Sequence, residues 1–478
     1  MMKAIGLNHS FESAVADIVD NSLDAGARKV LIRFIRDSAS LRSICIVDDG
    51  HGMDDKTIDR AMTVGGDRNY DEDDLGHFGI GLKAASLGQA RKLTVVSRAA
   101  NQPAVGRRWL IDAASKGFEC DVVGSGFATS LLDRDWRHLT PSSGTIVLWT
   151  EVKSFAAIAD AKALDRFIDS YLTKLRHHLG LVYHRLLAAK KVEIAVDVED
   201  VAAGEVGLPF SVDPIDPFGY IRSCRGDYPK VLRSTWRDRP IELNCCIWPG
   251  RSNHANFKLS GEKAEPFQGF FIYRNGRLLQ RGSWNGAVLP ERELQLARVA
   301  IDIDDTQSAL FTMNAEKTRV EASSEFGAVV QSATDGKTTF LQYLDHARSA
   351  YRDSQKRKRE RPKVRRPGKG FAEAVRSAID DEYEFLPGEA LDVRWVDLGD
   401  DTFFELDRED SLIRLNRRYR SAIIGGRDSS LNDAPLVKAL IYLLAEESFH
   451  GAFLGAKRKD NLAMWQSILT AAARAESK

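Results

Sequence analysis

The motif Asp17-Ile18-Val19-Asp20-Asn21 is the first of three short signals that decide how this chain folds. The second is Asp48-Asp49-Gly50-His51-Gly52-Met53, and the third is Gly76-His77-Phe78-Gly79-Ile80-Gly81-Leu82-Lys83. Each signal alone is weak, because acidic helices and pairs of glycines are common in proteins. Their order and spacing are much harder to obtain by chance, so we interpret the three together.

The first signal lies on a predicted amphipathic helix. Apolar residues recur at helical spacing between residues 11 and 22, and Asn8 or Ser10 could cap the N-terminus. Asp17 and Asn21 then share a face beside the apolar one. A carboxylate four residues before a carboxamide can hold a water molecule with one group and Mg²⁺, which prefers oxygen ligands, with the other. An ordinary solvated helix face would show the same pattern.

The second signal follows a predicted buried strand at residues 44–47 and turns through Gly50 and Gly52. Glycines permit positive φ and a close approach of the backbone. A carboxylate fixed at Asp48 can accept a hydrogen bond from an exocyclic amine, which would distinguish adenine from guanine. Met53 could pack on the base. The alternative is a simple Asp-Gly hairpin turn.

The third signal combines glycines with a lysine at the predicted start of a helix. Gly76, Gly79 and Gly81 could present backbone amides to phosphate oxygens, and the helix from about Leu82 adds a partial positive charge at its N-terminus. Lys83 adds a full charge. The signal is not a Walker P-loop, which needs GxxxxGK[ST], and it does not fit the dinucleotide fingerprint. Together the three signals predict a pocket for ATP and Mg²⁺.

The three signals resemble those of the GHKL ATPase superfamily over about residues 8–150. This superfamily groups the DNA gyrase B subunit, the ninety-kilodalton class of heat-shock chaperones, histidine kinases, the mismatch-repair protein MutL and MORC ATPases. The resemblance implies that Asp17 activates the attacking water and that Asn21 binds Mg²⁺. It also implies that Asp48 binds adenine and that the glycines of the third signal form a lid over the phosphates.

Two further stretches support the resemblance. The superfamily has a Gly-Thr pair that opens a late strand near the adenine, and Gly144-Thr145 matches it. The segment from Gly79 to Lys83 is more similar to MORC proteins and their bacterial MutL-like relatives than to gyrase. Residues 11–22 are similar to bacterial MORC-like ATPases found with restriction or phage-defence systems. The resemblance therefore points to that bacterial branch.

The position of Asp17 departs from the usual pattern, in which a glutamate stands there. Aspartate is shorter by one methylene and must still reach the attacking water, directly or through a second water. Two activities therefore stay open. One is an ATPase, with turnover that could be slow, and the other is an ATP-gated scaffold or binding protein with little or no turnover.

A lysine of the second domain is implied by the same resemblance. In members that dimerise, such a lysine reaches back to the γ-phosphate, and Lys317 is the candidate here. Residues 273–278 resemble the transducer segment that precedes this lysine in MORC-like proteins. Its charge would stabilise the transferring phosphoryl group. The alternative is an exposed lysine of no special role.

The chain of 478 residues is long enough for several domains. The prediction is a mixed α/β protein with an N-terminal Bergerat ATP-binding fold (an α+β sandwich), an S5-like transducer α/β domain that includes a strand at residues 192–198, and a small C-terminal α+β domain. The expected boundaries are 1–185 for the ATP-binding domain, 186–350 for the transducer, 351–370 for a basic linker and 371–478 for the C-terminal domain.

Composition and charge limit the partners. Lys plus Arg total 68 and Asp plus Glu total 68, so nothing global indicates nucleic acid or membrane. No apolar run is long enough to span a membrane, and five cysteines without a secretion signal indicate a cytoplasmic protein.

ATP is expected to order a lid at residues 65–81 and to drive homodimerisation, or engagement of a co-encoded defence protein. DNA could bind the basic linker. The sequence does not identify the partner, the DNA, the trigger, the route of dimerisation or the role of the C-terminal domain.

Overall fold

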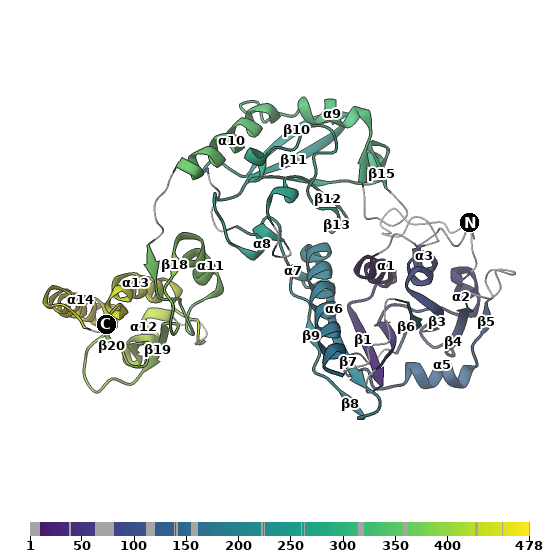
Figure 1. Cartoon of the computed structure of the whole chain (residues 1–478), viewed down its shortest axis with the longest axis horizontal. Helices are drawn as coiled ribbons and strands as arrows, with labels where there is room; N and C mark the ends of the chain where they lie inside the picture. The colour runs from purple at the N-terminus through teal and green to yellow at the C-terminus, as the bar shows by residue number, and fades with distance from the viewer. Residues whose placement is uncertain are drawn as a thin grey trace. The chain divides into compact units, whose positions relative to one another are not determined.

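The computed structural model divides the chain into two units (Figure 1). The first unit comprises Met1–Gly219, Ser223–Trp248 and Lys258–Tyr351, and the second comprises Tyr220–Arg222, Pro249–Phe257 and Arg352–Lys478. The described residues are 10–37, 40–62, 81–110, 120–137, 139, 142–153, 161–220, 223, 225–259, 261, 263–313, 320–356, 362–425, 429–451 and 453–477.

A nine-stranded sheet organises the N-terminal part of the first unit. Its strands follow the order β5 (Asp121–Val122), β4 (Val105–Leu110), β3 (Ala90–Arg98), β6 (Gly144–Val152), β2 (Ser40–Asp48), β1 (Lys29–Asp37), β7 (Glu193–Asp200) and β8 (Glu205–Val206), and β9 (Phe210–Ser211) also pairs with β7. Neighbours are antiparallel, except that β1 and β7 are parallel. The predicted mixed α/β fold is confirmed.

Helices cover both faces of this sheet. Successive side chains of a strand point to opposite sides, and here both sides carry apolar residues that need to be buried. Ile32 and Val95 belong to the core on one face, and Leu31 and Val96 belong to the core on the other. The second face is covered by α5 (Ser125–Leu132) and the segment after it. The helices of the first face are α1 (Phe11–Asp24), α2 (Asp55–Met62), α3 (Gly81–Gln89), α6 (Ala161–Val182) and α7 (His184–Ala188).

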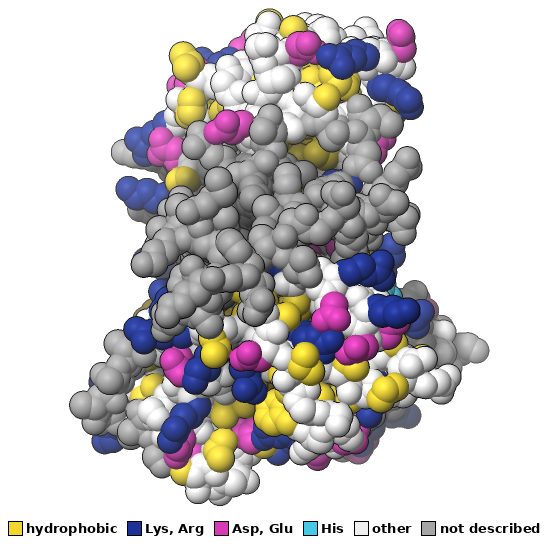
Figure 2. Space-filling view, turned by 90° about the vertical axis from the view of Figure 1, so that its right-hand side faces the viewer, with side chains coloured by type: hydrophobic (Ala, Val, Ile, Leu, Met, Phe, Trp, Pro, Cys, Tyr) yellow, Lys and Arg dark blue, Asp and Glu magenta, His cyan; other side chains and the backbone are white. Residues whose placement is uncertain are grey.

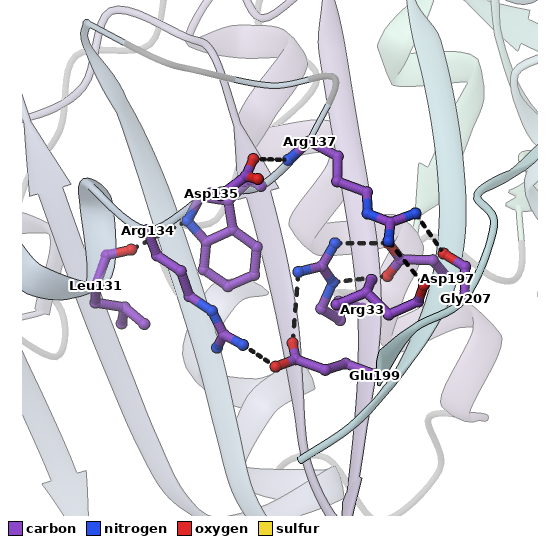
Figure 3. A network of polar contacts seen from close by, with 10 residues as sticks. Arg33, Leu131, Arg134, Asp135, Arg137, Asp197, Glu199 and Gly207 are labelled. Carbon is purple, nitrogen blue, oxygen red and sulfur yellow. Dashed lines mark hydrogen bonds and ion pairs between the residues drawn. The ribbon is translucent and has the colours of Figure 1, made fainter. Parts of the chain in front are cut away.

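A buried charge network lies on the α5 side of the sheet (Figure 3). Arg33 on β1 donates two hydrogen bonds to Asp197 on β7, at 2.8 and 2.7 Å, and one to Glu199 at 3.4 Å. Arg134 also donates to Glu199, and both guanidinium groups lie 5.1 Å from the ring of Trp136. Since Arg33 is fully buried, its charge requires these acidic partners. The network ties β7 to β1.

The first unit contains a second, five-stranded sheet. Tyr343 of α10 packs on it, and its hydroxyl donates to the carbonyl oxygens of Cys246 and Arg298 at 3.0 and 3.2 Å. The strand order is β10 (Lys230–Trp236), β11 (Arg239–Ile247), β14 (Ala297–Asp302), β12 (Gly269–Arg274) and β13 (Arg277–Gln280). A hairpin of β15 (Phe311–Met313) and β16 (Val320–Ala322) precedes α9 (Ser324–Gln331) and α10 (Phe340–Lys356).

One predicted strand belongs to a different sheet from the one expected. The strand predicted at residues 192–198 was assigned to the transducer, but β7 pairs in parallel with β1 and completes the first sheet. The Arg33 and Asp197 pair shows why, since two charges far apart in the sequence are buried only when these strands are neighbours. The first sheet therefore continues to Ser211, beyond the predicted boundary at residue 185.

The second unit contains residues 371–478, for which a small C-terminal α+β domain was predicted, together with Arg352 to Gly370 and two short earlier segments. Its core includes Val364, which lies in the predicted basic linker but is buried in β17, so part of that segment is folded. Its elements are β17 (Lys363–Val364), α11 (Glu373–Glu382), β18 (Glu384–Phe385), β19 (Asp392–Val396), β20 (Phe404–Asp407), β21 (Leu412–Asn416), α12 (Arg420–Ile424), α13 (Pro435–Ala445) and α14 (Ala456–Glu476), and most of α8 (Ala255–Lys258) joins them. Among the helices described in either unit, none combines the length and apolarity that crossing a membrane would need.

Candidate nucleotide-binding site

Asp48 is a buried carboxylate at the end of β2, with 4% of its surface exposed. Its Oδ1 accepts hydrogen bonds from the backbone amides of Gly50 at 3.0 Å and Thr145 at 3.2 Å. Its Oδ2 accepts from the hydroxyl of Ser22 on α1 at 3.0 Å. A carboxylate offers about four acceptor positions, so one position on Oδ2 remains for a ligand.

The protonation of Asp48 is set by its burial. Burial raises the pKa of this carboxyl to about 6, although the hydrogen bonds from Gly50, Ser22 and Thr145 oppose the rise. Asp48 is therefore mainly ionised at neutral pH. An ionised, fixed acceptor with one open position is suited to an amine donor such as that of adenine.

The two glycines after Asp48 are required by the backbone around them. Gly52 has φ +68°, and a Cβ at this position would lie 2.0 Å from the carbonyl oxygen of Arg98. A Cβ on Gly50 would lie 2.9 Å from both the Cβ and the carbonyl oxygen of Ala25. Neither position can take a side chain without moving backbone, so the turn is closely packed between α1 and β3.

Hydrogen bonds between hydroxyl groups connect the turn after Asp48 to β6, the strand that begins with Gly144 and Thr145. The backbone amide of Met53 donates to the hydroxyl of Ser97 at 2.8 Å, and this hydroxyl lies 2.9 Å from that of Thr145. Ser97 also donates to the carbonyl oxygen of Gly144 at 3.0 Å. The structure thus brings Asp48, Met53 and Thr145 together, as the sequence predicted, although their roles toward a nucleotide stay predictions.

Helix α1 begins as predicted, with the Ser10 hydroxyl accepting from the Ser13 amide at 3.2 Å. Asp17 is 3% exposed, whereas Asn21 is partly exposed. The Asn21 carboxamide donates to the carbonyl oxygen of Asp17 at 2.9 Å, so its own oxygen remains available as a ligand. In the part of the chain that the structure describes, no group of three or more His, Cys, Asp or Glu could hold a metal. A magnesium ion at Asn21 would therefore take most of its ligands from phosphate and water.

The buried face of α1 also meets an arginine of the second sheet. Arg277 Nε donates to Asp20 Oδ1 at 2.6 Å, and its Nη2 lies 3.9 Å from Asp17 Oδ1. The hydroxyl of Tyr183 lies 2.7 Å from the same oxygen of Asp20. Burial lowers the pKa of the Arg277 guanidinium, but the charges around it, chiefly that of Asp20, outweigh this and raise the pKa above its ordinary value. Arg277 is thus a fixed cation beside Asp17.

The third signal is described only in part. Gly81 begins α3, Leu82 packs against the core, and the Lys83 ammonium group is almost fully buried. Burial lowers the pKa of Lys83 to about 8, so a negative charge nearby would stabilise its protonated form. Gly76 and Gly79 lie outside the described residues, as does all of the predicted lid at residues 65–81 except Gly81. Lys317 lies there too, in the segment between β15 and β16.

Several residues of the site were not predicted from the sequence. The helical spacing placed Ser22 on the apolar face of α1. Its hydroxyl instead donates to Asp48, which connects α1 to the motif at residues 48–53. Ser97 gave no signal, because a serine at the end of a strand has many uses. Asp20 lies inside the first motif, but its partner Arg277 is 257 residues away. The Asn275-Gly276 pair before Arg277 is a hairpin signal that could have placed this arginine at the start of a strand.

Residues 9–125 match the family of histidine kinase-, DNA gyrase B- and HSP90-like ATPases. The part of the chain that contains Asp17, Asn21 and Asp48 is therefore similar to this family of ATPases.

Two curated proteins are similar to the chain over part of their length. The DNA mismatch repair protein MutL of Acidiphilium cryptum is 26% identical over 209 residues, which cover 40% of this chain and 35% of that protein. MutL of Rhodospirillum rubrum is 33% identical over 138 residues, 27% of this chain and 21% of that protein. The chain thus spans about a third or less of these relatives. A solved structure titled as the N-terminal domain of a DNA repair protein matches with 15% identity and a TM-score of 0.39, over 72% of this chain and 95% of that one.

Proposed function

We propose that the first unit is a Mg²⁺-dependent ATPase that resembles MutL in its use of ATP. The observation that carries the proposal is Asp48, a buried and mainly ionised carboxylate with one open acceptor position. Its turn is closed by glycines that exclude side chains, and Ser22 joins it directly to the helix of Asp17 and Asn21. Adenine recognition and phosphate chemistry are thus connected through one helix.

The proposed reaction assigns a separate task to each side chain. Asp48 accepts from the adenine amine, and Asn21 supplies an oxygen ligand to Mg²⁺, which would neutralise phosphate charge when bound. Asp17 takes a proton from the attacking water, as a general base. Lys83 sits at the start of α3, where its charge and the helix N-terminus favour phosphate.

Two variants separate binding from turnover. Asp17→Asn should bind ATP as the wild type does and release phosphate at a rate at least a hundredfold lower, since a general base contributes about 10²-fold to 10⁴-fold. Asn21→Ala should lose the magnesium dependence of ATP binding. Calorimetry with a nonhydrolysable analogue and a steady-state phosphate assay measure the two effects. An Asp17→Asn protein that turns over at the wild-type rate would overturn the assignment of the base.

The second candidate is an ATP-gated scaffold with little turnover. The observation that favours it is Asp17 itself, because this short carboxylate is almost fully buried and faces a fixed cation. Wild-type protein that binds ATP tightly but releases no phosphate would select the scaffold. Measurable release of phosphate that is lost in Asp17→Asn would support the ATPase instead.

Dimerisation and DNA association belong to the same proposal. The named relatives are mismatch repair proteins, which supports a DNA-linked role for this chain. On the face shown in Figure 2, acidic and basic side chains are interspersed over the described surface. DNA contact is assigned to the basic segment near residues 356–369 because of its sequence composition, with a homodimer formed when ATP binds and Lys317 completing the site. The restriction or phage-defence setting stays a prediction from the sequence resemblance.

Light scattering tests the homodimer. The mass of the purified protein should double when a nonhydrolysable ATP analogue is added, and Asp48→Asn should stay at the monomer mass. A wild-type mass that does not change while calorimetry shows saturation with the analogue would refute ATP-driven self-association.

A further inference from the structure

Arg277 belongs to the second sheet, yet its guanidinium group lies against α1, the helix that carries Asp17 and Asn21. It is 4% exposed, and Asp20 and Asp17 on α1 are 0% and 3% exposed. Nε of Arg277 is 2.6 Å from Asp20 Oδ1, while Nη2 is 3.9 Å from Asp17 Oδ1. The strong contact is therefore to Asp20, and the weaker one extends to Asp17, to which the general base role is assigned.

The sequence around Arg277 explains how it is placed. Asn275 and Gly276 have φ of +49° and +80°, as in the tight turns that join two antiparallel strands, so Arg277 begins β13 directly after the turn. A Cβ on Gly276 would lie 3.0 Å from Leu186 of α7. The turn thus packs closely on the nucleotide-binding part of the unit.

Two contacts beside the turn keep β12 and β14 against α7. The Tyr273 hydroxyl lies 3.0 Å from His184 Nε2. Arg185 donates to Asp302 at 2.5 Å, and its guanidinium carbon lies 3.5 Å from the centre of the Tyr273 ring. The strand that carries Arg277 therefore has a defined position relative to α1.

A guanidinium group is suited to this position for a geometric reason. Its planar fork can bond Asp20 through one nitrogen while another nitrogen points to Asp17, whereas an ammonium group is a single point charge. The hydroxyl of Tyr183 donates to the same oxygen of Asp20, since burial and the charge of Asp20 raise the pKa of this hydroxyl well above the ordinary value and keep it a donor. Asp20 and Tyr183 thus orient Arg277, and Arg277 faces Asp17.

We infer that Arg277 is a positioning residue that keeps Asp17 directed toward the attacking water. Restricting the orientation of Asp17 matters here, because a side chain one methylene shorter than glutamate tolerates less misplacement. The inference rests on the proposed ATPase activity and adds a residue from the second sheet to it.

Arg277→Lys tests the inference in the full-length protein. The variant keeps one positive charge but loses the fork, so kcat for ATP hydrolysis should fall at least tenfold. The dissociation constant of a nonhydrolysable ATP analogue and the melting temperature should stay near the wild-type values. Arg281→Lys is the matched control, since Arg281 directly follows the same strand and is exposed, and it should leave kcat unchanged.

A double variant covers the case in which the single change unfolds the protein. Arg277→Met with Asp20→Asn removes both buried charges at once, so the fold is not left with one unpaired charge. It should fold and bind the analogue, and still turn over at least tenfold more slowly. Wild-type kcat in a folded double variant, or unchanged or higher kcat in Arg277→Lys, would overturn the inference and leave the ATPase proposal standing. No phosphate release by the wild type would overturn the ATPase proposal and the inference with it.

Discussion

Asp48→Asn is the sharpest test of the nucleotide site, because the two oxygens of Asp48 have different partners. Oδ1 accepts from the backbone amides of Gly50 and Thr145, and Oδ2 accepts from Ser22. In the variant, the remaining oxygen can keep both backbone amides, which places the new NH₂ group at the Oδ2 position. This group would face the adenine amine, so a donor would meet a donor.

The expected loss can be worked from these contacts. A hydrogen bond to a charged acceptor contributes about 1.5–3 kcal/mol, and a buried donor without an acceptor costs about 1–3 kcal/mol. The sum is at least about 2.5 kcal/mol, and each 1.4 kcal/mol changes the affinity about tenfold. The dissociation constant for ATP should therefore rise by about sixtyfold or more. Guanine carries an acceptor oxygen where adenine carries its amine, so the preference of ATP over GTP should fall as well.

The stability of the variant should change little, which makes the test clean. The pKa of Asp48 in the folded protein, about 6, lies above that of a free aspartate, about 3.9. The folded state therefore holds more protons than the unfolded state between these values, and its stability falls as the pH rises through them. At pH 7 the ionised carboxylate already destabilises the fold, and the neutral Asn removes that cost. Asp48→Ala is a poorer test, since it would leave two buried amides without an acceptor.

The assay is calorimetry with ATP and GTP analogues, accompanied by thermal melting. Ser22→Ala is the matched control, because it removes the other hydrogen bond to Oδ2 and keeps the acceptor that the adenine would use. It should bind ATP within about tenfold of the wild type, given the roughly 1 kcal/mol of an ordinary hydrogen bond. An Asp48→Asn protein that melts normally and binds ATP as tightly as the wild type would refute adenine recognition by Asp48.

Three further predictions follow from the same geometry. Gly52→Ala should melt at a much lower temperature than Gly26→Ala, because both glycines have positive φ but only Gly52 is packed against backbone, at 2.0 Å. Asp197→Ala should lower the free energy of unfolding in urea by about 3–5 kcal/mol, since it leaves the buried Arg33 with only its longer bond to Glu199, at 3.4 Å. Asp165→Ala, which removes an exposed ion pair, should cost no more than about 1 kcal/mol, and equal losses would contradict the network argument. ATP should bind about tenfold more weakly at pH 5 than at pH 7 as Asp48 takes up a proton. The phosphates of ATP also titrate in this range, and Asp48→Asn shows how much affinity is lost for that reason alone. An equal loss of ATP affinity in the wild type and in Asp48→Asn would refute the role of Asp48 in the pH dependence.

Much of the first sheet and its turn could be predicted from the sequence, because the signals are local. Residues 44–47 form a buried strand whose end is Asp48, and the glycines that follow are required by contacts within a few ångströms. Ser10, one of the two caps that the spacing allowed, caps α1. In each case one short segment contains both the pattern and its physical reason.

The pairings between distant segments could not be predicted in this way. A strand pattern at residues 192–198 shows that a strand forms, but its partner β1 is chosen by long-range contacts such as that of Arg33 with Asp197. Arg277 likewise reads as one arginine among many until the fold places it on Asp20. When two buried charges pair between segments far apart in the sequence, neither segment carries a periodic pattern that predicts the pair.

Helix α1 explains why the first motif is so compact. Within six consecutive residues, it presents Asp17 and Asp20 to Arg277 of the second sheet and Ser22 to the carboxylate of Asp48, and it carries Asn21, the predicted metal ligand. A helix turns about 100° per residue, so neighbouring positions reach different sides at almost the same height. Any displacement of α1 on nucleotide binding must therefore move the contact with Arg277 as well. The second sheet would sense the nucleotide through two buried carboxylates, without needing a contact to the nucleotide itself.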